Sequence, residues 1–133
     1  MSVRSALAGL LFAAPALPCD PGLPGNDTAR IEGQRYVVAW RPRPAPIPLG
    51  EFFALEIAVC ARAGASPPAT LRVDAQMPEH RHGMNYRPSV ARAGDGRFVA
   101  SGLLFHMPGR WEFSFELRAA EQSETLRASV PIH

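Results

Sequence analysis

The side chains with the most distinctive chemistry in this 133-residue chain are concentrated in two short segments. Residues 77–88 hold two of the four histidines and two of the four methionines, and residues 105–111 add His106 and Met107. Imidazole nitrogen and thioether sulfur are ligands that suit copper, and thioether sulfur selects Cu(I). A copper site built from both segments is therefore the sharpest hypothesis that these residue types support.

The spacing of these residues indicates how they would converge. His80 and His82 are two residues apart, so in an extended backbone their side chains project to the same side. His106 and Met107 would diverge in a strand, but a turn would bring both inward. Zinc fits less well than copper because Glu79 is the only carboxylate within the first segment. The candidate metal ligands are His80, His82, Met84, His106 and Met107, followed by Met77.

A structural interpretation of the same residues stays open, whereas a catalytic one is not expected. Histidines and methionines beside Pro and Gly also occur in ordinary loops, where the imidazole bonds to the backbone and the thioether fills gaps. Catalysis is not expected, because no serine stands in a nucleophile-elbow pattern and no free cysteine pairs with a histidine. We therefore expect a protein that is not an enzyme.

The start of the chain has the features of a secretory signal peptide. Arg4 supplies a positive charge, an apolar stretch of small residues follows, and small residues stand at 14 and 16. Cleavage is expected after Ala16, so residues 1–16 would be the signal peptide, and the protein would be periplasmic or secreted, with no membrane span in its mature form. The net charge of +2 does not favour nucleic-acid binding.

The two cysteines favour a disulfide between Cys19 and Cys60, because an even number of cysteines in an exported chain is typical of paired thiols. Such a bond would tie an irregular, Pro- and Gly-rich arm at residues 17–33 to the body of the domain. Two unpaired thiols, or lipid attachment at Cys19, are the alternatives.

The remaining residues, 34–133, read as one all-β domain. Alternation of apolar and polar residues predicts strands near residues 34–41, 52–62, 70–77, 89–92, 97–105, 111–118 and 126–132. The alternation over 70–77 places Met77 on the buried face. The prolines at 42–48 exclude a central strand there. About seven short strands separated by turns predict an immunoglobulin-like Greek-key β-sandwich, with a small barrel as the alternative.

The two segments also resemble a known family. Residues Met77, Pro78, His82, Gly83 and Met84, then Gly96 and Phe98, then Met107, Pro108, Gly109 and Trp111 look like the turn motifs and the glycine-aromatic strand of the YtkA-like domain family, which is similar to FixH. The resemblance extends from residue 34 to residue 130. It implies an exported immunoglobulin-like domain, and some relatives are linked to copper handling or oxidase assembly. FixH relatives carry a membrane anchor that this chain would lack once processed.

Two functions follow as hypotheses. The first is an exported soluble copper chaperone or scavenger with a His/Met site formed by the two segments. The second is a periplasmic module without metal that presents its loops or an edge strand to a partner protein. The distance between the two segments in the folded chain separates the two hypotheses.

Overall fold

The structure, a computed structural model, describes residues 9–12 and 19–133. It contains nine β-strands: β1 (Ala29–Glu32), β2 (Tyr36–Arg43), β3 (Phe52–Ala61), β4 (Thr70–Met77), β5 (His82–Gly83), β6 (Ser89–Arg92), β7 (Arg97–Leu104), β8 (Gly109–Ala119) and β9 (Gln122–Ile132). In the part of the chain that the structure describes, no helix is long and apolar enough to cross a membrane. The expected signal-peptide cleavage after Ala16 lies outside the described residues.

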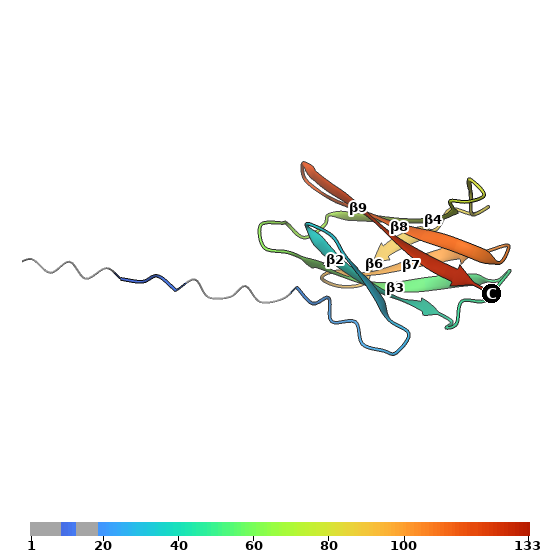
Figure 1. The fold of residues 1–133 in the computed structure, drawn as a ribbon, viewed down its shortest axis with the longest axis horizontal. Coiled ribbons are helices and arrows are strands. Elements are labelled where there is room, and N and C mark those ends of the chain that lie inside the picture. Colours follow the sequence, from blue (N-terminus) through green and yellow to red (C-terminus); the bar gives the residue numbers. More distant parts are fainter. Residues whose placement is uncertain (1–8, 13–18) are drawn as a thin grey trace, which may run out of the picture.

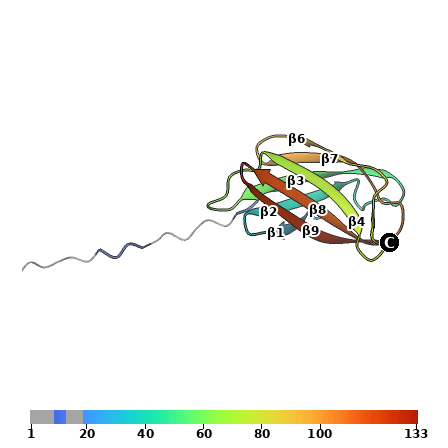
Figure 2. The same cartoon turned by 90° about the horizontal axis from the view of Figure 1, so that it is seen from above.

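The strands form two antiparallel sheets that pack face to face (Figures 1 and 2). One sheet has the order β1-β2-β3-β7-β6 and the other has the order β5-β4-β8-β9. The orders β2-β3-β7-β6 and β4-β8-β9 are those of strands ABED and CFG in an immunoglobulin-like sandwich. The predicted all-β fold is confirmed: seven strands occupy the expected positions, and β1 and β5 are short additions at the sheet edges.

The core forms because the inward residues of both sheets are apolar at every second position. Strand β4 alternates strictly between buried and exposed residues, and β8 alternates in step with it. Aromatic rings fill the centre, with Trp40 5.0 Å from Phe115 and Phe53 5.0 Å from Phe105 between ring centroids. The inward residues of the β4–β8 pair are Leu71, Val73, Ala75, Met77, Trp111, Phe113, Phe115, Leu117 and Ala119.

Two details of the first sheet differ from the sequence-based expectation. The arm over residues 17–33 was expected to be irregular, but it contains β1. This strand pairs with β2, with Ala29 opposite Trp40. Strand β2 also runs through Pro42, although proline cannot donate to a ladder. The proline is tolerated because the pairing with β1 ends at Trp40, so β2 has a partner only on the β3 side at that point.

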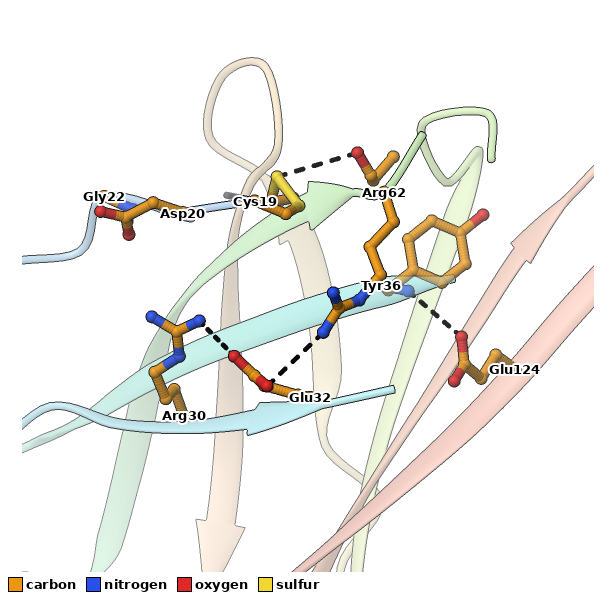
Figure 3. Close-up of a disulfide and its surroundings, with 10 residues drawn as sticks. Cys19, Asp20, Gly22, Arg30, Glu32, Tyr36, Arg62 and Glu124 are labelled. Carbon is orange, nitrogen blue, oxygen red and sulfur yellow. Dashed lines mark hydrogen bonds and ion pairs between the residues drawn. A yellow bond between two sulfur atoms is a disulfide. The ribbon is translucent and has the colours of Figure 1, made fainter. Parts of the chain in front are cut away.

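The disulfide between Cys19 and Cys60 is present, with the two Cα atoms 5.8 Å apart (Figure 3). Cys60 lies near the end of β3, on the face turned away from the core. The arm that it anchors continues along the first sheet, where Arg97 and Arg41 donate to the carbonyl oxygens of Gly22 and Pro24 at 2.9 and 2.8 Å. The disulfide and these bonds hold the N-terminal arm against the sandwich.

Near the same end of the sandwich, Glu124 of β9 connects the second sheet to the start of β2. Its carboxylate accepts hydrogen bonds from the backbone N–H groups of Gln34, Arg35 and Tyr36 at 2.6, 2.8 and 3.2 Å. Figure 3 shows Glu124 directed at Tyr36. Burial raises the pKa of the Tyr36 phenol above its usual value of 10.0.

Candidate metal centre

Both histidine- and methionine-bearing segments lie at one end of the sandwich, because of how β4 and β8 are paired. The two strands are antiparallel neighbours, with Gln76 opposite Glu112. The end of β4 therefore lies beside the start of β8. The segment that follows β4 and the turn that precedes β8 emerge together, at the end where the C-terminus lies (Figure 1).

Three of the four imidazoles gather there. The ring centroid of His82 is 5.7 Å from that of His80 and 5.2 Å from that of His106. His82 is held by β5, whose pairing places it opposite Met77 at the end of β4. His80 and His106 are exposed, whereas His82 is half-buried. The two distant segments thus come together around His82.

These ring separations can be compared with those of imidazoles bound to one ion. A metal–nitrogen bond of about 2.0–2.1 Å puts each ring centroid roughly 3 Å from the metal, so two rings on one ion lie at most about 6 Å apart. Both separations from His82 fall within that limit. Within residues 9–12 and 19–133, however, no group of three or more His, Cys, Asp or Glu side chains is arranged to hold a metal ion. Coordination by all three imidazoles would therefore need side-chain rotation.

A backbone contact favours one tautomer of His82. Its Nδ1 lies 3.1 Å from the carbonyl oxygen of Gly83. A carbonyl oxygen only accepts, so this contact is a hydrogen bond when Nδ1 carries the proton. The lone pair of Nε2 is then available to a ligand, which is the arrangement usual for metal-bound histidine.

A buried tryptophan forms the base of the histidine cluster. The Trp111 ring lies 5.9 Å from the ring of His82 and 5.4 Å from that of His106, both edge-to-face. Trp111 is fully buried, stacks on Phe105 at 4.5 Å, and donates from Nε1 to the carbonyl oxygen of Met107 at 3.0 Å. Contacts on both sides of the indole fix its position, so the base of the cluster is rigid.

The three candidate methionines differ in their surroundings from the histidines. Met77 is 1% exposed and belongs to the core. Its methyl carbon reaches the second segment, where a Cβ added at Gly109 would lie 2.5 Å from it. Met84 and Met107 are half-buried and pack against the core. All three thioethers therefore contribute to packing, and Met84 and Met107 are the two with partial access to the surface.

An ion pair joins the two segments at the surface. Arg110 Nε donates to Glu79 Oε1 at 3.0 Å, and Arg110 also donates to the hydroxyl of Ser129 at 3.1 Å. Glu79, the nearest carboxylate to the histidines in sequence, is thereby engaged by a guanidinium. An exposed pair of this kind contributes about 0–1 kcal/mol, so it orients the segments more than it stabilises the fold.

The structure also shows residues at this end that the sequence did not single out. The exposed aromatic rings of Phe52 and Tyr86 contact each other, with centroids 4.9 Å apart. Leu49 is exposed nearby, next to Gly50, whose N–H donates to the carbonyl of Phe105 at 2.8 Å. A run of prolines before Leu49 was the only signal of a structured loop, and it gives no information on this contact.

Comparisons of the chain with protein-family models, with curated proteins and with solved structures found no match.

Proposed function

We propose that this protein is an exported copper-binding protein that carries or scavenges the ion with the histidine cluster at the end of the sandwich. The observation that carries the proposal is the approach of His106 to within 6 Å of His82, from a segment more than twenty residues away in sequence. His80, from the same segment as His82, lies within 6 Å of it as well. Imidazoles that are merely turn residues have no reason to gather in this way around one half-buried histidine.

The ligand types favour copper over zinc. Both cysteines are consumed by the disulfide, so no thiolate is left for a structural zinc site. Neutral imidazole and thioether remain, and these suit Cu(I), an ion that is satisfied by two or three ligands. His82 with one neighbouring histidine supplies two. A change of rotamer in Met84 or Met107 would supply a third, which is within the flexibility of an unbranched side chain.

The exposure of His80 and His106 supports a transferable ion more than a permanently enclosed one. Ligands at the surface can be replaced one at a time by those of an acceptor, whereas a fully buried site would first have to open. We retain membership of the YtkA-like family as part of the proposal, since the Met-Pro turns that carry the resemblance are the turns that bring the histidines together.

Export is proposed from the disulfide together with the apolar start of the chain. N-terminal sequencing of the protein recovered from the periplasm or medium is expected to show a first residue at Leu17. A chain recovered only from the cytoplasm, or one that retains residues 1–16, would contradict export by cleavage.

The test of copper binding is a titration with Cu(I) in competition with a chromophoric chelator. The purified protein is compared with a variant that carries His80→Ala, His82→Ala and His106→Ala together. We expect the triple variant to bind at least about a hundredfold more weakly, since it loses every imidazole of the cluster. The matched control is Gln122→Ala, at the end of β9 away from the histidine cluster, which should leave the affinity unchanged. Equal affinity for the wild type and the triple variant would exclude the site.

A second function is favoured by a specific observation. The exposed rings of Phe52 and Tyr86 lie at the same end as the histidines, and exposed aromatic residues are typical of protein contact surfaces. If the titration shows no copper binding, a metal-free interaction module that uses this end is the function that remains.

A further inference from the structure

The exposed large apolar side chains of the folded domain share one location. Within residues 19–133 they are Leu49, Phe52 and Tyr86, which are 44%, 56% and 48% exposed. Phe52 begins β3 and lies opposite Leu104, which directly precedes the second histidine-bearing segment. Tyr86 belongs to the first such segment. The apolar surface and the histidine cluster are therefore adjacent parts of the same end of the sandwich.

The histidine cluster has coordination positions that the chain does not fill. The described residues offer no group of three His, Cys, Asp or Glu side chains that could enclose an ion. His80 and His106 face outward, and the thioethers of Met77, Met84 and Met107 pack toward the core. A copper ion held by two of these imidazoles, with Met84 and Met107 left in their packed positions and not recruited as a third ligand, would keep a coordination position open. A ligand from another molecule can reach that position.

A second copy of this chain can supply the ligand for the open coordination position. Around a two-fold axis each copy presents the same surface to the other, so imidazole faces imidazole and apolar patch faces apolar patch. This end carries exposed charges of both signs, namely Arg81, Arg87 and Glu51. In the described part of the chain, none of the three forms an ion pair. Glu51 precedes Phe52 and Arg87 follows Tyr86, so a two-fold contact through the patch can bring opposite charges together.

The apolar patch is small, so a dimer formed through it would need the metal ion as a further link between the two copies. Three partly exposed side chains cover far less than the roughly 1,200 Å² of total surface that a stable dimer buries. The apolar contact alone is therefore too small to hold two copies together. Bonds from both copies to one ion would add what the contact lacks.

We propose that two copies of this chain bind one copper ion between their histidine clusters, with the Phe52–Tyr86 patches in contact around it. This inference rests on the proposed function, since without copper binding there is no shared ion. It adds the partner, a second copy, and a stoichiometry of one ion for two chains.

Sedimentation velocity of the purified full chain, with 0, 0.5 and 1 equivalent of Cu(I), tests the inference. Ascorbate is the reductant, because it keeps copper reduced without opening the disulfide. We expect a monomer without metal and a dimer at 0.5 equivalent. A double variant with Phe52→Ser and Tyr86→Ser is expected to raise the dimer dissociation constant by about tenfold or more, as the loss of central interface aromatics does. The control is Gln122→Ala, at the turn at the opposite end of β9, which should behave as the wild type.

Each outcome has a defined meaning. A monomer that binds one copper ion per chain overturns the shared site but leaves the proposed function intact. A dimer that forms without metal overturns the role of the ion. A protein that binds no copper overturns both. Copper-dependent dimerisation that the Phe52→Ser/Tyr86→Ser variant retains at full strength shows that the two copies meet elsewhere, and this also overturns the proposal.

Discussion

His82 is the residue on which the candidate centre depends most. Its ring is the one within reach of both other imidazoles, and its Nδ1 is engaged by the Gly83 carbonyl. We predict that His82→Ala lowers Cu(I) affinity more than His80→Ala or His106→Ala does, by about tenfold or more relative to either, because only the central substitution disrupts both neighbouring pairs. Competition titrations of the three single variants measure this, and equal losses at all three positions would show that no imidazole is central.

Gly109 is a residue at which the backbone disfavours a side chain and at which the Met77 methyl group would have to move to admit one. Its φ is +135°, and an added Cβ would lie 2.5 Å from the methyl carbon of Met77. We predict that Gly109→Ala destabilises the fold by about 2 kcal/mol or more, as the sum of backbone strain and overpacking. The measurement is urea unfolding followed by tryptophan fluorescence.

Gly64 provides the matched control for this substitution. Its φ is +85°, but a Cβ added there meets nothing within 4 Å. Gly64→Ala therefore carries the backbone strain alone, about 1 kcal/mol. The difference between the two variants isolates the contact with Met77. If the two variants lose the same stability, the Met77 side chain moves aside at no cost and is not a packed part of the core.

At the scale of elements, the strands that the sequence predicted are those with a long apolar alternation. Strand β4 and strand β8 each keep one face apolar over their whole length, so local pattern and burial agree. Strand β1 has no such pattern: its residues are largely exposed, and it exists because its backbone pairs with β2. Strand β5 has two residues and depends in the same way on the end of β4. Pairing of this kind is not local, so the sequence could not show it.

The candidate site was predictable to the same extent. Residue types and spacing pointed to His80, His82 and His106, and the antiparallel pairing of β4 with β8 explains why their segments share an end. The ring separations depend on side-chain rotamers and on the indole of Trp111 beneath them. The indole is fixed in part by its hydrogen bond to the Met107 carbonyl oxygen, a contact with the backbone that residue types do not reveal.

The disulfide between Cys19 and Cys60 fixes the N-terminal arm to strand β3, so its removal should destabilise the fold. It joins residues 41 apart in sequence, and closing a loop of that length in the unfolded chain stabilises the fold by about 4 kcal/mol in the chain-entropy description. A variant with Cys19→Ser and Cys60→Ser should lose roughly that stability, measured by guanidinium unfolding. Its Cu(I) affinity should be unchanged, because Cys60 lies at the end of β3 opposite to the histidine cluster. A parallel loss of affinity would mean that the two ends are coupled.

At the scale of the whole molecule, the two ends of the sandwich carry different kinds of residues. One end carries the disulfide and the Glu124 contacts that hold the N-terminal arm and the sheets together. The other end carries the histidines and the exposed apolar residues, on loops that a rigid core positions. His80 and His106 are exposed and His82 is half-buried, so substitutions of these histidines should leave the fold intact, whereas the methionines beside them also pack against the core.

This arrangement leads to a prediction about stability as copper and pH change. Free Cu(I) at a hundred times its dissociation constant should stabilise the protein by about 2.7 kcal/mol, seen as a rise of several degrees in Tm that a chelator reverses. The rise should shrink as the medium is made more acidic, because protons compete with copper for its ligands.

The metal-free protein supplies the baseline for that measurement. The Arg43 guanidinium lowers the pKa of Asp27 below its usual 3.8, so the stability from Asp27 is present above that value and is lost only as the pH falls further. The raised pKa of Tyr36 makes its contribution complete below its usual 10.0 and lost only at more alkaline pH. Neither group titrates between neutral and mildly acidic pH. A Tm rise that stays constant over this range, or that persists in the triple histidine variant, would place copper on ligands other than the imidazoles.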